Sequence, residues 1–225
     1  MSSGQWRLRS GNAADPLRCA VLLSGSGSGM EALAKEQKAQ SEAIYTINLV
    51  ISNNPGVQGI GKAEAQGLAT MVLDHRIHPK EGRRAAHEAV LLEALRVHDI
   101  ELVVLSGYMR LLSPRFLQHW GRPVLNIHPS LLPAFPGAHA HRDVLEARAG
   151  VTGCTVHLVD DGMDTGPVLA QTPVPVLKGD NEHLLSQRVK LEEHRLYPRI
   201  VHQIAAGEIA LTSDGRSVIR DRLDD

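Results

Sequence analysis

The sequence predicts an α/β protein with a Rossmann-like, mostly parallel central sheet flanked by helices and extended by antiparallel strands in its C-terminal half. Two observations support this prediction. Short aliphatic runs alternate with helical patterns over residues 19–127, and two longer β runs follow after residue 150. Alternation of strand and helix is typical of parallel strands joined by right-handed crossovers.

The expected elements of the first half follow in order. An apolar run predicts a buried strand over residues 19–24, which leads into a glycine loop at residues 25–29. Met30 and Leu33 then give a helix over residues 30–38 one apolar side. A strand is expected over residues 45–52, followed by a turn at 53–56, a short helix to about residue 66 and a strand over 70–73. A long helix over residues 80–97 and two strands, over 99–105 and 124–127, complete this half.

The second half begins with the two β runs, at residues 151–159 and 167–176, whose intervening loop predicts an antiparallel addition to the sheet. Residues 182–205 predict one long helix or two, with a break near Pro198 because proline lacks the N–H that a helix needs. A small closing hairpin is expected from residues 209–211 and 217–219. We expect residues 1–17 to be a flexible extension and residues 18–225 to form a single domain.

The composition limits the class of protein. A chain of 225 residues with 43% hydrophobic and 3% aromatic residues can bury a full aliphatic core. The formal net charge of -1 argues against nucleic acid as a partner. Two cysteines, Cys19 and Cys154, form no disulfide framework and fit a reducing compartment. The sequence has no apolar run that would span a membrane or act as a signal peptide, so we expect a cytoplasmic protein.

The glycine loop reads Gly25-Ser-Gly-Ser-Gly29 between a predicted strand and a predicted helix. Backbone N–H groups and a helix N-terminus together favour an anion. A dinucleotide fingerprint fails because Met30 stands where the third glycine is needed, and Ser52-Asn53 ends the next strand without an acid for a ribose. The loop therefore indicates a phosphate monoester site, and the alternative is a tight turn that needs small residues.

A second motif is Asn126-Ile-His128-Pro-Ser130, at the end of a predicted parallel strand. The period of two places the side chains of Asn126 and His128 on one face. Open α/β sheets carry their sites at this edge. An amide can donate to an oxyanion, and an imidazole can hold or transfer a proton near neutral pH. The alternative is a buried pair that satisfies the loop backbone.

A third motif is the acidic loop at residues 160–164, which holds Asp160, Asp161 and Asp164. It lacks the alternating ligands of a calcium loop. We expect one of these acids to reach His128 and raise its pKa, and the alternative is an ordinary turn rich in Asp and Gly. The sequence has 12 histidines, but no spacing typical of a zinc site, and we expect no metal.

Three longer runs, at residues 103–114, 126–133 and 157–167, together resemble the folate-dependent formyltransferases. Residues 24–28, 51–54 and 188–194 are similar to the branch of that family whose acceptor is glycinamide ribonucleotide, an intermediate of purine synthesis. The resemblance covers roughly residues 18–211. It implies the formyltransferase fold, small-molecule substrates, and transfer of a formyl group from 10-formyltetrahydrofolate to the ribonucleotide amine, and it allows a homodimer.

The resemblance also implies roles for particular residues. His128 would be the catalytic acid, Asn126 would hold the formyl oxygen, and Asp164 would support His128 and relay protons. The ribonucleotide would lie in the first half, to about residue 110, and the folate and the chemistry in the second. The implied folate-binding residues are Arg84, Met109, Arg110, Leu111, Leu112, Asn126, Val159, Asp160, Asp161 and Asp164. The implied ribonucleotide-binding residues are Gly27, Ser28 and Gly29 at the phosphate and Glu193 at the ribose hydroxyls.

One position departs from the pattern of this branch, which usually reads Gly-x-Gly-Ser-Asn where this chain has Gly29. The amide side chain is missing, so we expect weakened or rearranged phosphate binding.

Other functions remain as alternatives. They are a 10-formyltetrahydrofolate hydrolase, in which water replaces the amine, a formyltransferase acting on aminoacyl-tRNA, and a non-catalytic folate or nucleotide-binding module. The hydrolases usually carry a further N-terminal domain, and the near-neutral charge disfavours tRNA. A pure binding module would not need Asn126, His128 and Asp164 together.

Overall fold

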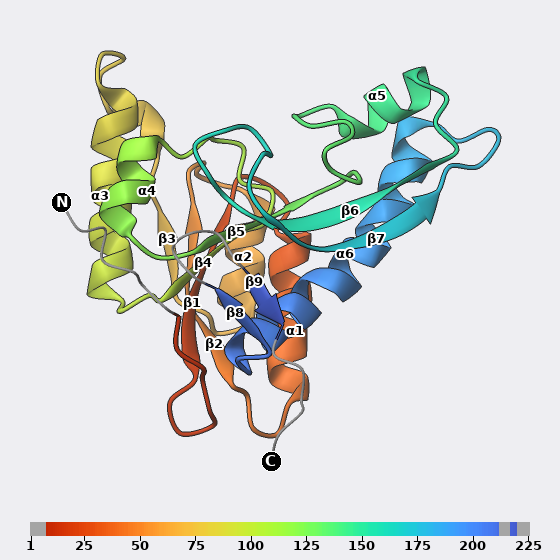
Figure 1. The fold of residues 1–225 in the computed structure, drawn as a ribbon. Helices are drawn as coiled ribbons and strands as arrows, with labels where there is room; N and C mark the ends of the chain where they lie inside the picture. Colours follow the sequence, from red (N-terminus) through yellow and green to blue (C-terminus); the bar gives the residue numbers. More distant parts are fainter. Residues whose placement is uncertain (1–7, 212–216, 220–225) are drawn as a thin grey trace.

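The structure is a computed structural model that describes residues 8–211 and 217–219. Its central sheet has seven strands in the order β3-β2-β1-β4-β5-β6-β7 (Figure 1). The pairs from β3 to β5 are parallel, and β6 and β7 are added antiparallel. This arrangement confirms the predicted mixed sheet with its antiparallel C-terminal addition.

The strands are β1 (Leu17–Leu23), β2 (Tyr45–Ser52), β3 (Thr70–Val72), β4 (Leu102–Leu105), β5 (Val124–His128), β6 (Val151–Leu158) and β7 (Val168–Pro175), with β8 (Ile209–Leu211) and β9 (Ser217–Ile219) in a separate antiparallel hairpin. The helices are α1 (Ser28–Ala39), α2 (Gln58–Ala65), α3 (Arg83–Val97), α4 (Pro114–Trp120), α5 (Ala140–Glu146), α6 (Glu182–Ala205) and the 3-10 turn η1 (His75–Ile77).

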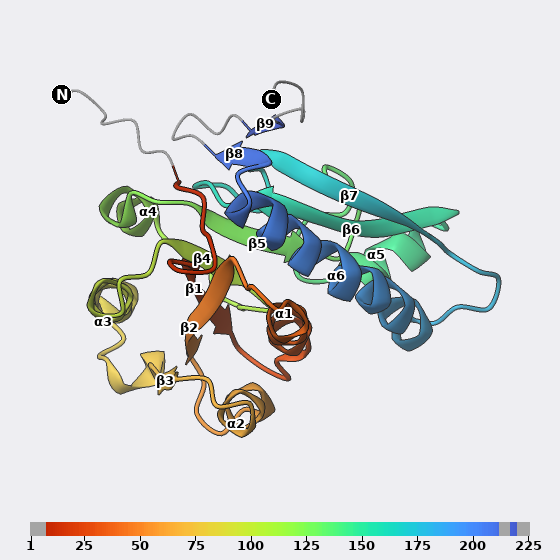
Figure 2. The same ribbon diagram turned by 90° about the horizontal axis from the view of Figure 1, so that it is seen from below.

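The sheet separates two aliphatic cores. Successive residues of β1 face opposite sides of the sheet. Val21 therefore packs beneath α1, α2 and α6, whereas Leu22 packs beneath α3 and α4. Figure 2 shows α3 and α4 on one side of the sheet and α1 and α6 on the other. Because both faces are covered, the central strands are continuously apolar, which is the pattern that made them recognisable in the sequence.

Helix α6 is continuous over 24 residues, so of the two expected arrangements the single helix is the one present. Pro198 lies inside it and removes one backbone hydrogen bond. The helix continues because Tyr197, Pro198 and Ile200 are buried, and this packing offsets the lost bond.

Helices α4 and α5 and the turn η1 were not expected from the sequence. For α4 a local signal exists, because the Ser113 side chain accepts a hydrogen bond from Phe116 N at 3.1 Å and Pro114 occupies the first helical position. The helix is only 7 residues long, which is too short for a hydrophobic period to be visible.

Residues 8–17 are held against the domain. Leu17 opens β1 and is fully buried. The Arg9 guanidinium reaches Glu101 at 2.6 Å, and Gly11 N donates to Ala205 O at 2.8 Å. The expected flexible extension thus includes a segment with specific contacts, and residues 1–7 lie outside the described part of the chain.

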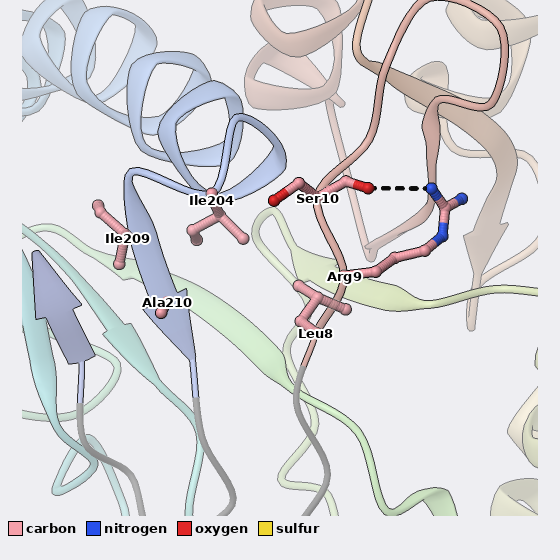
Figure 3. A pocket seen from close by; sticks show the side chains of 7 residues that line it. Leu8, Arg9, Ser10, Ile204, Ile209 and Ala210 are labelled. Carbon is pink, nitrogen blue, oxygen red and sulfur yellow. Dashed lines mark hydrogen bonds between the residues drawn. The ribbon is translucent and has the colours of Figure 1, made fainter. Parts of the chain in front are cut away.

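A cavity of about 410 Å³ lies between this segment and the C-terminal hairpin, far from the carboxyl ends of the parallel strands. Figure 3 shows its lining side chains, with the Arg9 guanidinium directed to the Ser10 carbonyl at 3.1 Å. The lining residues are Leu8, Arg9, Ser10, Ile204, Gly207, Ile209 and Ala210. The described lining side chains include a guanidinium and a hydroxyl but no carboxylate, imidazole or thiol. Among the described residues, no helix combines the length and apolar character needed to cross a bilayer.

The buried hydroxyl of Tyr197 joins α6 to the sheet, because its Oη donates to Leu105 O at 2.9 Å. We expect Tyr197→Phe to lower the free energy of unfolding by about 1–3 kcal/mol, because it removes the donor and keeps the ring. Urea denaturation checks this expectation. An unchanged midpoint at an unchanged slope would show that this bond does not stabilise the packing of α6.

Candidate active site

The pairing of β5 with β6 brings the first site residues together. In this antiparallel register Asn126 lies opposite His157, and His128 lies opposite Thr155. Side chains of directly opposed residues share a face of the sheet, and residues two apart on one strand do as well. Asn126, His128 and His157 therefore project to the same side, at the carboxyl end of β5.

Asp164 reaches this group from the loop between β6 and β7. Its Oδ2 lies 3.3 Å from His128 Nδ1, and its Oδ1 lies 3.7 Å from His157 Nε2. Gly137 N donates to the same Oδ2 at 2.8 Å. Asp164 has a φ of 56°, a left-handed conformation uncommon for a side-chain-bearing residue and often found at functional sites. The expected contact between an acid of this loop and His128 is present.

His157 fixes the orientation of the Asn126 amide. Its Nδ1 lies 2.9 Å from Leu158 O, a carbonyl that can only accept, so Nδ1 carries the proton. Burial lowers the pKa of His157, which favours the neutral ring. Nε2 is then an acceptor, and Asn126 Nδ2 donates to it at 3.2 Å. The second hydrogen of the Asn126 amide remains available to a ligand.

His128 lies between two acceptors and is 4% exposed. Its Nε2 donates to Phe135 O at 2.9 Å, and its Nδ1 faces the Asp164 carboxylate. Only the doubly protonated ring donates to both partners at once. The site thus combines an amide donor, an imidazole that can carry a positive charge, and a carboxylate that balances it.

Thr155 and Ser130 hold the loop that follows His128. Thr155 Oγ1 donates to Ser130 O at 2.6 Å and accepts from Leu132 N at 3.1 Å. Ser130 Oγ donates to Ala134 O at 2.6 Å. Both side chains are fully buried. These bonds set the backbone that positions Phe135 O and Gly137 N before any ligand arrives, which is the preorganisation that catalytic hydrogen bonding requires.

A cavity of about 390 Å³ lies beside this cluster and contains the glycine loop. Its lining residues are Ser24, Gly25, Ser26, Gly27, Ser28, Gly29, Ser106, Gly107, Met109, Ile127, Pro129, His141, Ser186, Lys190, Glu193, His194 and Tyr197. Gly27 has a φ of 72°, and a Cβ there would lie 2.6 Å from Gly59 Cα, so this position requires glycine. The predicted phosphate loop and Glu193 therefore line one cavity.

Helix α6 supplies the expected Glu193 to this cavity, together with Ser186, Lys190 and Tyr197, which the sequence interpretation missed. Ser186, Lys190, Glu193 and Tyr197 recur at spacings of three and four, so they share a face of the helix. That spacing was a detectable signal. The missed residue with most consequence is Lys190, because its ammonium brings a positive charge to a cavity that already has a helix N-terminus.

Burial controls the ionisation of this lining. It raises the pKa of the Glu193 carboxyl to about 7, although the nearby Lys190 acts in the opposite direction. It also lowers the pKa of His141 and of His194, which favours their neutral forms. The cavity thus holds one lysine and side chains that are neutral or partly neutral near pH 7, which suits an anion.

Ser24 connects the glycine loop to the segment after β4. Its Oγ donates to Asn53 Oδ1 at 2.5 Å and accepts from Met109 N at 2.8 Å. Asn54 Nδ2 donates to Ser24 O at 3.0 Å. The ends of β1, β2 and β4 are therefore tied together by one buried network.

The residues implied in folate binding lie on three segments near the cluster. Arg84 Nη2 donates to Leu111 O at 2.8 Å, so the arginine supports the segment from Met109 to Leu112. Met109 and Leu111 are 73% and 58% exposed, whereas Leu112 is buried. Such exposed apolar side chains beside polar groups suit a flat organic ligand.

The third segment is the acidic loop. Val159 N donates to Val124 O at 2.9 Å, which fixes the start of the loop at β5. Asp160 Oδ1 accepts from Gly162 N at 3.0 Å and from Thr165 Oγ1 at 2.8 Å, so this carboxylate is engaged within the loop, and Asp161 is exposed. Over residues 8–211 and 217–219, no group of three or more His, Cys, Asp or Glu side chains is placed to hold a metal ion.

An amide donor, a chargeable imidazole and a carboxylate next to a cavity suited to an anion are groups that a group-transfer enzyme can use. The comparison with known sequences identifies which group is transferred. The profile of the formyl transferase family matches residues 17–201, and the chain belongs to this family.

Individual relatives agree with this assignment. The chain is 38% identical to the phosphoribosylglycinamide formyltransferase of Escherichia coli (strain K12) over 191 residues, which are 85% of this chain and 88% of that protein. It is 42% identical over 199 residues to the trifunctional purine biosynthetic protein adenosine-3 of Bos taurus, which are 88% of this chain. These residues are 19% of the trifunctional protein, so the chain spans about a fifth of its length.

A solved structure shows the same fold. The crystal structure of glycinamide ribonucleotide transformylase 1 from Symbiobacterium toebii matches with a TM-score of 0.85 and 38% sequence identity. The match covers 92% of this chain and 95% of that one. This agreement confirms the predicted formyltransferase fold.

The raised pKa of Glu193 leads to a prediction about stability. Between pH 4.5 and about pH 7 the folded protein retains on Glu193 a proton that the unfolded chain has released. The free energy of unfolding therefore falls as the pH rises through this range. Glu193→Gln stays neutral throughout. We therefore expect it to match the parent protein at about pH 4 and to be more stable at about pH 8. Thermal unfolding at both pH values measures this, and equal differences at the two values would contradict it.

Proposed function

We propose that this formyltransferase moves the formyl group of 10-formyltetrahydrofolate to the amine of glycinamide ribonucleotide, a step in purine synthesis. The observation that carries the proposal is that the cluster of Asn126, His128 and Asp164 lies beside the cavity that contains the glycine loop. Ile127 and Pro129, which flank His128, line the cavity that also contains Gly27 and Glu193. The Escherichia coli relative, a phosphoribosylglycinamide formyltransferase, supports the same acceptor.

The ribonucleotide binds in the cavity of the glycine loop. Its phosphate accepts hydrogen bonds from the backbone N–H groups of residues 27–29 at the start of α1, with Lys190 adding positive charge. Glu193 binds the ribose hydroxyls. This places the glycinamide amine toward Ile127 and the cluster on β5.

The folate binds across the segment from Met109 to Leu112, with Arg84 and the loop from Val159 to Asp164 on either side. Apolar contact with Met109 and Leu111 covers the ring faces, and backbone groups of these segments pair with the ring edge. Its formyl group then lies between Asn126 and His128. We place the reaction in the cytoplasm, because the buried free thiols of Cys19 and Cys154 fit a reducing compartment, and we expect no metal.

The chemistry is a direct acyl transfer. The free amine attacks the formyl carbon, a C–N bond forms, and the carbonyl π electrons move to oxygen. The Asn126 amide donates to this oxyanion, the adjacent His128 ring supplies positive charge, and Asp164 balances the charge on His128. When the carbonyl re-forms, the bond from carbon to the folate nitrogen breaks. The attacking nitrogen loses a proton and the leaving nitrogen gains one, with His128 and Asp164 as the proton relay.

Two bound substrates held in this geometry make a covalent enzyme intermediate unnecessary. His157 contributes indirectly, because it orients the Asn126 amide through the bond at 3.2 Å. It is a positioning residue rather than a group that touches the formyl carbon.

An absorbance assay with a 10-formyl folate analogue tests the proposal, with each substrate omitted in turn. We expect deformylation to require glycinamide ribonucleotide. Deformylation without the ribonucleotide would instead indicate a hydrolase. Folate binding without any turnover would indicate another acceptor or a non-catalytic module, and either result would contradict the proposal.

Removal of the catalytic groups should separate chemistry from binding. We expect His128→Ala and Asp164→Asn each to lower kcat by about a hundredfold or more, because the reaction loses the imidazole beside the oxyanion or the carboxylate that balances its charge. Folate affinity, measured by fluorescence quenching, should stay within a small factor. His119→Ala, an exposed histidine on α4, is the matched control and should leave kcat unchanged. Full turnover in either of the first two variants would refute the assigned roles.

A further inference from the structure

Ser106, which follows β4, has a hydroxyl that nothing in the described part of the protein uses. The residue is 8% exposed and lines the glycine-loop cavity. Its backbone N donates to Leu22 O at 2.8 Å, whereas its Oγ forms no hydrogen bond with the residues that the structure describes. A hydroxyl on a residue that is nine-tenths buried, that lines a cavity and has no partner among the described residues, is available to a bound molecule.

The hydroxyl lies against the first turn of α1. A Cβ built on Gly29 would lie 2.3 Å from Ser106 Oγ and 3.6 Å from Ser106 Cβ. The first distance is far inside van der Waals contact, and the second is an ordinary contact. Ser106 Oγ therefore fills the space that a side chain at residue 29 would need. The absence of a side chain at Gly29 leaves room for the Ser106 hydroxyl, which is the hydrogen-bond donor at this point.

The N–H groups at the start of α1 have no side-chain cap and are open to a ligand. Gly27 is the N-cap of α1 and forms no side-chain hydrogen bond to the helix, so the first N–H groups lack a side-chain acceptor. Glu31, the acidic residue of the first turn, is paired with Lys62 at 2.7 Å. The remaining charged groups of the cavity are Lys190 and Glu193. An anion can therefore reach these N–H groups without meeting an unpaired carboxylate of α1.

We propose that Ser106 Oγ donates a hydrogen bond to the phosphate group of the ribonucleotide and replaces the amide donor that residue 29 cannot supply. The identity of the ligand rests on the proposed function. The contact between Ser106 Oγ and a phosphate group at the start of α1 does not depend on that identity, because any phosphate monoester could make it. Ser106 is thus a substrate-binding residue that compensates for Gly29.

Two single variants and their combination test the pairing. We expect Ser106→Ala to raise KM for glycinamide ribonucleotide about tenfold or more, the range for a hydrogen bond to a charged group. The kcat and the KM for the folate should change less than about twofold. Gly29→Ala should weaken binding at least as much, because its Cβ displaces the hydroxyl. Gly29→Ala with Ser106→Ala should be no worse than Ser106→Ala alone, since the new Cβ then fits.

A rescue variant tests the chemistry of the donor. Gly29→Asn with Ser106→Ala moves the donor to residue 29, and we expect KM to return toward the parent value. Gly61→Ala is the matched control, because it adds a Cβ to a glycine of α2 that has open space around it. It should leave KM unchanged.

Calorimetric binding of inorganic phosphate and of glycinamide ribonucleotide separates this inference from the proposed function, because it needs no turnover. Weaker binding of both to Ser106→Ala, with an unchanged thermal midpoint, supports the inference even if no formyl transfer occurs. Unchanged phosphate binding in Ser106→Ala overturns it. The inference is also overturned if Ser106→Ala loses as much affinity for the dephosphorylated form of glycinamide ribonucleotide as for the ribonucleotide itself. The hydroxyl would then act on another part of the ligand.

Discussion

The antiparallel pairing of β6 with β5 is the constraint on which the site depends. The parallel strands before it end at one edge of the sheet, and β5 presents Asn126 and His128 there. A sixth parallel strand in the place of β6 would not bring His157 and Asp164 to β5 in this way. Because β6 runs the other way, His157 lies opposite Asn126, and the loop that follows β6 returns Asp164 to His128 at 3.3 Å. One reversal of direction thus assembles the donor, the acid and the carboxylate.

Helix α6 and Ser24 join the two substrate regions. The helix packs on the face of the sheet that carries α1, and one of its sides brings Lys190 and Glu193 to the glycine loop. Ser24 bonds to Asn53 and to the backbone of Met109, so the glycine loop and the segment from Met109 to Leu112 share a buried hydrogen-bond network. A cluster between two such fixed regions can hold two reactants in a defined relative position, which supplies much of the barrier reduction in a transfer reaction.

Local patterns in the sequence were enough for the mixed sheet and for the placement of site residues within one segment, but not for the short helices α4 and α5. A period of two placed Asn126 and His128 on one face, and a glycine loop before a helix predicted an anion site where the structure has a cavity. The orienting role of His157 depends on strand register, and the pairing of Ser106 with Gly29 depends on a tertiary contact between α1 and the end of β4. Neither is a property of one segment, so spacing within a segment could not reveal it. Helix α6 continues through Pro198 for the same reason, since burial against the sheet overrides a local preference.

The most direct test of this account is a crystal structure with glycinamide ribonucleotide and a folate analogue whose formyl group cannot be transferred. We expect the formyl oxygen within hydrogen-bond distance of Asn126 Nδ2, about 3 Å, with the contact between His128 and Asp164 retained. We also expect the phosphate at the start of α1. A formyl group bound away from Asn126 and His128, or a phosphate outside the glycine-loop cavity, would contradict the central claim that this strand reversal builds the reaction centre.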